Sequence, residues 1–340
     1  MVKVSTIGLD IGKKVFQVHG VDAAGMVTVN RPLRRGQVLA FFAKLAAPCL
    51  VGLEACATSH YWARELRKLG HAVRLIAPAY AKAYVRRNKT DAADAAGICE
   101  AVSRPAMRFV GIKTPEQQAA AGLHKVRTLL LKQRTMTSNA LRSLMAEFGI
   151  VVAHGPQHVG ELVALLADPH EHRIPAPLHD GLKRLVDTLA ALAEQIAAVD
   201  AQILGWGRAD ATCRHLITIP GYGPILSSAM AAMVVDPTVF RSGRDFAASL
   251  GLVPRQDGTG GKVRLGPISK RGNGYLRRLL VNGAMAVLCG RHARKDPWLA
   301  KLLATKKRKV AAVALANKMA RFGWVVMMRQ EDFRARPAAA

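Results

Sequence analysis

Apolar and polar positions alternate in short runs over the first part of the chain, a pattern typical of strands interleaved with helices. The runs that predict strands cover residues 4–9, 15–21, 26–29, 50–53 and 72–76. Helical spacing over 37–46 and 61–69 separates the later runs. Three short strands followed by strand–helix–strand–helix predict an α/β domain with a mixed sheet, which we assign to residues 1–110.

The next zone, residues 111–205, contains a regular helical seam. Its apolar positions step alternately by three and four residues through Leu182, Leu185, Leu189, Leu192, Ile196, Val199 and Ile203. This spacing is typical of a coiled coil. An earlier helix is expected near 115–148, and several prolines predict an irregular connection between the two. The seam fits an intramolecular helical hairpin and an intermolecular coiled coil equally well, so this zone is predicted to be a spacer or an assembly element.

The third zone, residues 206–340, is predicted to be mainly helical. Gly221 and Gly223 lie in an Ile-Pro-Gly-Tyr-Gly segment just before a helical stretch at 226–233. Such a turn exposes backbone N–H groups at a helix N-terminus, where phosphate binds readily. We expect a helix–hairpin–helix-like contact with nucleic-acid backbone, with a plain helix–turn–helix corner as the alternative. A glycine- and cation-rich loop is expected at 256–274, followed by a helix at 275–288.

The charge of the chain points to a polyanion as partner. Its 50 Lys and Arg exceed its 23 Asp and Glu, which gives a net charge of +27. Clustered cations neutralise phosphates and release counterions, so a small neutral metabolite is not the default substrate. The net charge is +10 over 1–110, 0 over 111–205 and +17 over 206–340. The candidate nucleic-acid contacts are Arg86, Arg87, Lys89, Gly221, Gly223, Arg255, Lys262, Arg264, Ser269, Lys270, Arg271, Arg277, Arg278, Lys306, Lys307, Arg308 and Lys309.

The remaining composition excludes several classes of protein. Half of the residues are hydrophobic, which argues against a disordered chain. Five cysteines without C-x-x-C spacing are expected to be reduced thiols rather than a disulfide framework or a zinc site. A signal peptide and an apolar run of about 18 residues are not expected. We therefore predict a cytoplasmic protein of a prokaryote, associated with the nucleoid and not with a membrane.

Four carboxylates of the first zone lie where they can converge. Asp10 ends the first predicted strand and Glu54 ends a later one, while Asp91 and Asp94 begin a predicted helix on one face. Hard carboxylate oxygens are the ligands that Mg²⁺ prefers, and two such ions about 4 Å apart could clamp the attacking and leaving oxygens of a phosphodiester. The alternative is that Asp91 caps the helix and Asp94 completes a box at its first turn. The four together favour a metal site.

The ordered set of motifs resembles a known family over nearly the whole chain. Gly8-Leu9-Asp10, Gly52-Leu53-Glu54 and Asn88-Lys89-Thr90-Asp91-x-x-Asp94 resemble the RuvC-like (RNase H-like) DEDD domain of the IS110 insertion-sequence transposases. Residues 219–223, 246–256, 260–273 and 276–280 resemble their second domain, especially in the IS1111 subgroup. The resemblance implies a RuvC-like domain at 1–110, a helical coiled-coil spacer at 111–205 and a C-terminal transposase domain at 206–340.

The resemblance also implies a DNA recombinase guided by a structured bridge RNA from its own element, which pairs with donor DNA and target DNA. Members act as homo-oligomers, dimers or dimers of dimers, in which the carboxylates of one subunit join a nucleophilic hydroxyl of another. The hydroxyl attacks a phosphodiester and leaves a covalent protein–DNA link and a free 3′-OH.

The hydroxyl of this chain differs from the family pattern. The family serine follows the Leu-x-Pro proline by five residues and precedes a glycine, and the corresponding residue here is Thr259. Threonine offers the same hydroxyl with a β-methyl group that crowds the approach to phosphorus. We assign the role to Thr259. Ser269 fits a phosphate contact better and Ser249 fits helix packing, while His60, near Glu54, is interpreted as structural.

Two other functions remain open. A RuvC-like, structure-selective nuclease would activate water with the four carboxylates and leave Thr259 inert. A non-catalytic RNA- and DNA-binding scaffold would need neither the carboxylates nor the hydroxyl. A covalent adduct between protein and DNA that survives denaturation is expected of the recombinase, and of neither the nuclease nor the scaffold.

Overall fold

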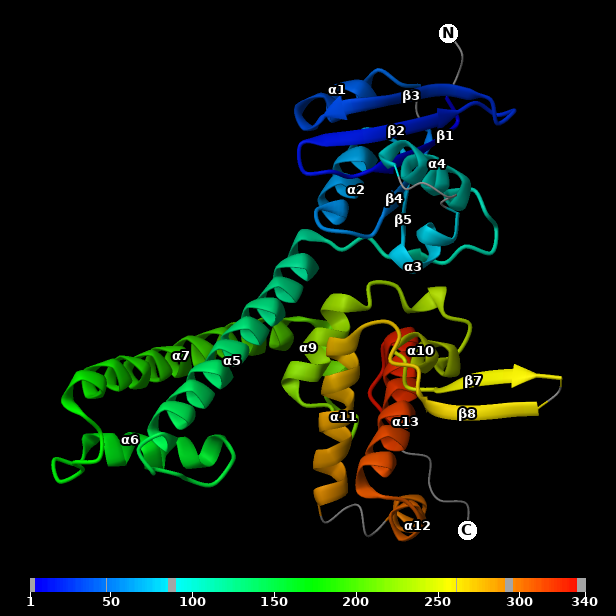
Figure 1. Ribbon diagram of the computed structural model, residues 1–340. Helices are drawn as coiled ribbons and strands as arrows, with labels where there is room; N and C mark the ends of the chain where they lie inside the picture. The colour runs from blue at the N-terminus through cyan, green and yellow to red at the C-terminus, as the bar shows by residue number, and fades with distance from the viewer. Residues whose placement is uncertain (1–3, 47, 85–89, 261, 291–295, 335–340) are drawn as a thin grey trace. The chain divides into compact units, whose positions relative to one another are not determined.

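The chain divides into two units, each with its own core (Figure 1). The computed structural model describes residues 4–46, 48–84, 90–260, 262–290 and 296–334. Unit 1 contains Met1–Pro115 and a short excursion, Met233–Arg241, and unit 2 contains Glu116–Ala232 and Ser242–Ala340. The helices of the middle zone therefore group with the third zone in one unit.

Unit 1 is built on a mixed sheet of six strands in the order β3-β2-β1-β4-β5-β6. β1 pairs antiparallel with β2 and parallel with β4, β2–β3 and β5–β6 are antiparallel, and β4–β5 is parallel. The strands are β1 (Thr6–Asp10), β2 (Val15–Val21), β3 (Val27–Arg34), β4 (Leu50–Glu54), β5 (Ala72–Ile76) and β6 (Phe109–Val110). The predicted α/β class and mixed sheet are confirmed, although β3 extends past the expected run and β6 was not expected.

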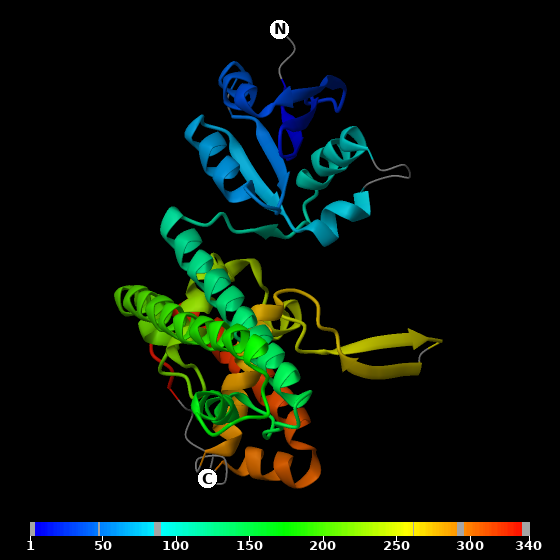
Figure 2. The ribbon, with the colours of Figure 1, turned by 60° about the vertical axis from the view of Figure 1, so that its left-hand side comes forward.

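Different helices cover the two faces of this sheet (Figure 2). Alternate strand residues point to opposite faces, so Leu9 and Leu53 share one buried face. They pack there with Phe42 of α1 (Val38–Ala43) and Leu66 of α2 (Ser59–Lys68). α4 (Asp91–Val102) packs on the other face, across β1 and β4. The elements η1 (Arg35–Gln37), α3 (Pro78–Ala81) and η2 (Lys82–Tyr84) complete the first part of unit 1.

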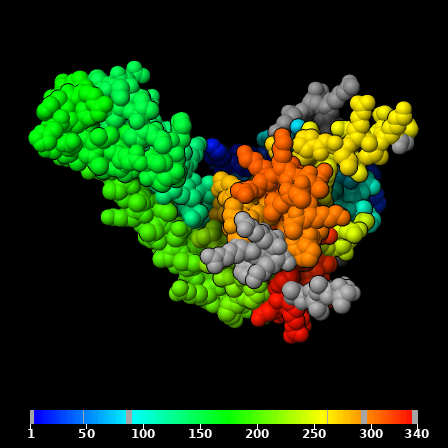
Figure 3. All heavy atoms as spheres, turned by 90° about the horizontal axis from the view of Figure 1, so that it is seen from below, coloured from blue at the N-terminus to red at the C-terminus, as the bar shows by residue number. Residues whose placement is uncertain are grey.

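The long helices of unit 2 form an arm, drawn in green in Figure 3. It contains α5 (Pro115–Ala146), η3 (Pro156–His158), α6 (Val159–Ala167) and α7 (Ala176–Ala209). Leu182 of the predicted seam is fully buried with Leu141 and Met145 of α5, and Leu185 and Leu189 pack against the same cluster. The first half of the seam is thus used within the chain, as the intramolecular hairpin requires.

The remaining helices of unit 2 form a second group. They are α8 (Ala211–Leu216), α9 (Pro224–Met233), α10 (Gly243–Ser249), α11 (Gly274–Cys289), α12 (Pro297–Thr305) and α13 (Arg308–Arg329), with η4 (Pro237–Val239) in the excursion to unit 1. In this group α8, α10, α11 and α12 contact α13. By length and composition α13 is apolar enough to cross a membrane, contrary to the expectation from sequence, but half of its apolar window is buried in the fold. Its packing against α10 and α11 gives those apolar residues a place in a protein core.

One predicted element of unit 2 is wrong. Much of the loop expected at 256–274 is an antiparallel ribbon of β7 (Pro254–Thr259) and β8 (Lys262–Ile268). Thr259 pairs with Lys262 across the ribbon, and Gly260, directly after Thr259, has a positive φ of +57°. A glycine at such a turn is a hairpin signal, because it adopts positive φ without steric cost.

Candidate active site

Two of the predicted carboxylates stand side by side at the end of the sheet. β1 and β4 are parallel and in register through Gly8–Gly52 and Leu9–Leu53. Asp10 and Glu54 therefore end adjacent strands at the same edge of the sheet. Each acid lies two residues after a glycine, so glycine and carboxylate share the face that α4 covers.

The two glycines let α4 approach the sheet closely. A Cβ atom on Gly8 would lie 2.0 Å from the carbonyl oxygen of Ala95 and 2.4 Å from the amide nitrogen of Cys99. One on Gly52 would lie 2.7 Å from Cβ of Val102. Any larger residue would push α4 away from β1 and β4. The sequence motif Gly-Leu-acid thus combines a contact surface for a helix, a core leucine and a carboxylate at the strand end.

The first turn of α4 supplies the other two carboxylates. Thr90 is the N-cap, since its hydroxyl accepts the amide hydrogen of Ala93 at 3.2 Å. The alternative in which Asp91 caps the helix is therefore wrong, and Asp91 and Asp94 occupy the first helical turn. Negative charge is favoured there because the unpaired amides carry partial positive charge.

Three of the four carboxylates form a cluster. Among the described residues, one ligand oxygen from each of Asp10, Asp91 and Asp94 lies within 4.8 Å of the others. Glu54 is not a member of this cluster, although its charge acts on Asp10. The set is made of hard oxygen donors, partly exposed, which fits a divalent cation such as Mg²⁺.

The electrostatics of the cluster also fit a cation. Burial, followed by the charges of Asp94, Asp91 and Glu54 in that order, raises the pKa of Asp10 from 3.8 to about 6. Burial, with the charges of Glu54 and Asp10, raises the pKa of the neighbouring Cys56 thiol as well. The site therefore concentrates negative charge that a bound cation would neutralise.

His60 has a structural partner near this site. Its Nδ1 accepts the backbone amide of Lys113 at 3.2 Å, which ties α2 to the segment that leaves β6. This contact agrees with the structural interpretation of the histidine.

The predicted nucleophile belongs to the other unit. Thr259 is exposed at the end of β7, and all six residues of that strand are exposed. The next residue, Gly260, has a φ of +57°, which a side chain rarely adopts. Ser249 donates to the carbonyl of Phe246 at 2.7 Å within its own helix, in agreement with a packing role. The structure thus places the predicted hydroxyl on an open ribbon and the carboxylates in a packed domain.

The predicted nucleic-acid contacts fall into different environments. Gly221 is packed against α11 and α13, because a Cβ there would lie 2.9 Å from Val287 and 2.7 Å from Met319. Gly223 is exposed, so only the second glycine of the predicted helix–hairpin–helix lies open at the start of α9. Arg277 donates hydrogen bonds to the backbone carbonyls of Leu250 and Arg271, so it joins the segment before β7 to the segment after β8.

The other predicted contacts are mostly open to solvent. Exposed positions are Arg255, Lys262, Arg264, Lys270, Arg271, Arg278, Lys306, Lys307, Arg308 and Lys309. Ser269 is half-buried and its amide donates to Val253. Arg86, Arg87 and Lys89 lie outside the described residues.

Sequence reasoning missed a buried polar junction in unit 2. The ring of His124 on α5 is hydrogen-bonded to the Tyr275 hydroxyl at 2.9 Å and to the Ser228 hydroxyl at 3.1 Å. Burial, followed by the charge of Arg127, lowers the pKa of His124 to about 4, so the ring is neutral near pH 7. The junction fixes the arm against α9 and α11. A single histidine among helical leucines gave no signal for it.

Comparisons with known proteins cover both parts of this site. A family model for DEDD transposases of the IS110 type matches residues 7–150, which contain the four carboxylates. A model described as the transposase IS116/IS110/IS902 family matches residues 213–301, which contain Thr259.

Individual relatives match over nearly their full length. A probable family 20 transposase of Pseudomonas aeruginosa is 48% identical over 334 residues, or 97% of this chain and 98% of its own. The transposase for insertion sequence element IS1328 of Yersinia enterocolitica is 40% identical over 96% of this chain and 97% of its own. The transposase for insertion sequence element IS1111A of Coxiella burnetii is 37% identical over 98% of this chain and 92% of its own.

Proposed function

The chain belongs to the IS110 family of insertion-sequence transposases, and from this premise we propose how its residues divide the work of DNA recombination. The cluster of Asp10, Asp91 and Asp94 carries the proposal. These residues, with Glu54 beside them, would hold Mg²⁺ at the edge of the sheet. The ion would supply positive charge to the phosphate that is attacked.

Thr259 is the proposed nucleophile. Its hydroxyl oxygen attacks the phosphorus of a DNA phosphodiester and gives up its proton. The bond from phosphorus to the 3′ oxygen breaks, and that oxygen takes a proton to become a free 3′-OH. The covalent link between threonine and the 5′ phosphate keeps the energy of the broken bond, so a 3′-OH can reverse the step without ATP.

The partners follow from the family and from charge. We propose that an element-encoded bridge RNA, donor DNA and target DNA bind the basic surfaces of both units, since the chain carries a net charge of +27. We propose that the protein acts as a dimer or tetramer, with contacts outside the arm seam, because Leu192, Ile196 and Ile203 of that seam are already buried within one chain. The protein would act in the bacterial cytoplasm, where its DNA substrates lie.

The decisive experiment is a search for the covalent adduct. Wild-type protein, incubated with Mg²⁺, guide RNA and a labelled donor junction, is expected to leave DNA attached to protein after denaturation. Thr259→Ala should abolish the adduct, and Thr259→Ser should restore it because the hydroxyl is kept. Strand cleavage that persists in Thr259→Ala without an adduct would instead support a nuclease that uses water.

A further inference from the structure

Unit 1 contains a cavity outside the carboxylate site that is rich in arginine and tyrosine. It has a volume of about 540 Å³ and is lined by Tyr80, Tyr84, Arg104, Met107, Arg108 and Arg241, with two alanines. None of these described lining residues is acidic. Pockets of roughly 300–1,000 Å³ commonly hold small ligands.

Three separate segments build this arginine–tyrosine cavity. α3 and η2 supply Tyr80 and Tyr84, and the turn between α4 and β6 supplies Arg104 and Arg108. Arg241 ends the excursion of residues 233–241, which returns to unit 1 from between α9 and α10.

The excursion is held in place by a close contact. A Cβ on Gly111 would lie 2.7 Å from Cβ of Val235, so only glycine lets these backbones approach. The carboxylate of Asp236 accepts the amide of Thr238 at 2.8 Å and starts η4. Arg241 therefore reaches the cavity on an ordered support.

The base of the cavity is apolar and its rim is charged. Tyr84 and Met107 pack against the core cluster that contains Ile76 and Ile98, whereas Tyr80 is 46% exposed. Arg104 pairs with Glu100, but both side chains are about half exposed, so this ion pair is weak and a phosphate can compete for the guanidinium. The cavity thus offers aromatic faces beside cations.

This combination matches the two parts of a nucleotide. Guanidinium groups bind phosphate oxygens in a bidentate manner. Tyrosine rings stack on bases that are not paired, as in proteins that bind single strands. In a duplex the bases are stacked on each other and their faces are not available to a protein side chain.

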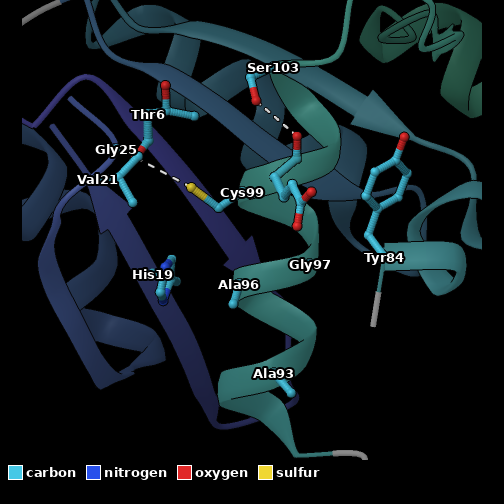
Figure 4. Close-up of a pocket in the computed structure, with 11 residues that line it drawn as sticks. Thr6, His19, Val21, Gly25, Tyr84, Ala93, Ala96, Gly97, Cys99 and Ser103 are labelled. Carbon is cyan, nitrogen blue, oxygen red and sulfur yellow. Dashed lines mark hydrogen bonds between the residues drawn. The ribbon is translucent and has the colours of Figure 1, made fainter. Parts of the chain in front are cut away.

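A second cavity follows α4 from the arginine–tyrosine cavity toward the helix turn that carries Asp94. Figure 4 shows it between α4 and residues of β1 and β2, Thr6, His19 and Val21, with a volume of about 420 Å³. Its lining runs from Ala93, next to Asp94, over Ala96 and Gly97 to Ser103, and it shares Tyr84 with the arginine–tyrosine cavity. Ala93, Ala96 and Gly97 leave room for a strand along the helix, and Glu100, the ion-pair partner of Arg104, also lines this cavity. On its other side, the buried Nδ1 of His19 has no hydrogen-bond partner among the described residues.

We propose that the arginine–tyrosine cavity binds an unpaired nucleotide of a nucleic-acid strand that runs along α4 to the carboxylate cluster. The phosphate lies on Arg108 and Arg241, and the base stacks on Tyr80 or Tyr84. The inference rests on the proposed function in one respect, that nucleic acid is the ligand of unit 1.

Photochemical cross-linking tests the base contact directly. The full-length protein is irradiated with single-stranded DNA, single-stranded RNA or duplex DNA that contains 5-iodouracil, and the linked peptides are identified by mass spectrometry. Cross-links at Tyr80 or Tyr84 are expected with single strands, and the DNA and RNA arms identify the source of the nucleotide. Cross-links that lie only elsewhere, or equal yields from duplex, overturn the proposal.

Equilibrium binding tests the phosphate and stacking contacts. For a single strand, Arg108→Gln and Arg241→Gln are each expected to lower the slope of log affinity against log salt by about 0.7 to 1. Tyr80→Leu should weaken binding by about 5- to 100-fold, whereas Tyr80→Phe should retain it because the ring is kept.

The control is Lys44→Gln, an exposed cation at the end of α1, on the face of the sheet opposite α4. Melting curves of every variant establish that unit 1 is folded. If the arginine variants match Lys44→Gln in salt slope, and Tyr80→Leu matches Tyr80→Phe, the cavity is not a nucleotide site. That failure is distinct from failure of the proposed function, because the Thr259-dependent adduct would still form.

Discussion

The carboxylate cluster and the Thr259 ribbon supply the two halves of one proposed reaction, yet they are built in opposite ways. The cluster depends on the close approach of α4 to Gly8 and Gly52, where an added Cβ atom would lie less than 3 Å from the helix, so its geometry is set by packing. The ribbon is exposed along all of β7 and nearly all of β8, so nothing in its own unit buries the hydroxyl. A metal site needs fixed distances between its ligands. A nucleophile that is delivered to a site on another part of the assembly must instead be exposed on a segment that extends from its own unit.

The largest expected effect is the loss of strand exchange when either half is inactivated, and mixing the two variants tests whether the halves act from different subunits. Asp10→Asn and Thr259→Ala should each lower strand exchange by about 10³-fold or more, because each removes a group that acts on the reacting phosphate. When the two inactive proteins are mixed, activity should return, since an intact cluster and an intact hydroxyl then meet in mixed oligomers. Recombination of a plasmid donor and target measures this. A mixture as inactive as its components would mean that both halves act within one chain.

Packing at the cluster predicts the next effect. Gly8→Ala places a Cβ atom 2.0 Å from a backbone oxygen of α4, and such overpacking should cost about 3 kcal/mol of unfolding free energy. Gly266→Ala on the ribbon is the matched control, because its nearest neighbour would lie 3.7 Å away. Urea denaturation measures both, and hydrogen exchange of the α4 amides locates the change. Equal stability of the two variants would contradict the close approach of α4.

The charge of the cluster predicts a smaller effect that depends on pH. The pKa of Asp10 is raised from 3.8 to about 6 in the folded protein, so the folded state binds more protons than the unfolded state between these values. The stability of unit 1 should therefore fall as the pH rises through that window. Without metal at pH 7.5, Asp10→Asn should be more stable than wild type by about 1–2 kcal/mol after allowance for solvent screening.

Thermal melting at several pH values measures this difference. The gain from Asp10→Asn should disappear below about pH 4, where the carboxyl is protonated in both states. Added Mg²⁺ should stabilise wild type and not the variant. Asp187→Asn, at an exposed position of α7, serves as a control. If the wild-type protein is more stable than Asp10→Asn in the absence of metal, then burial and the neighbouring carboxylates do not disfavour the Asp10 charge.

The smallest expected effect concerns the ribbon alone. Arg264→Gln at its exposed position should change the unfolding free energy by less than about 0.5 kcal/mol. The same change should lower the salt dependence of duplex DNA binding by a slope of about 0.9 if the arginine contacts one phosphate. Fluorescence anisotropy at several salt concentrations measures the slope. An unchanged slope would remove Arg264 from the nucleic-acid surface.

Much of the site could be predicted because local patterns determine it. Asp10 and Glu54 were placed at strand ends by the short apolar runs that precede them, and β2 and β5 match the expected 15–21 and 72–76. Asp91 and Asp94 were placed on one helix face by their spacing. Their capping alternative failed because Thr90, one residue earlier, has the preferred hydroxyl for the N-cap.

Other features depended on contacts between distant segments. The family motifs, the acids at element ends and the charge division of the chain can be read from the amino-acid order alone. The folded chain was needed to show that α4 lies against Gly8 and Gly52, that Glu54 stays outside the three-acid cluster, and that Arg241 joins Arg108 in a cavity. The physical reason is range: propensity, capping and periodicity act over a few residues, whereas ligand distances follow from how closely whole elements pack.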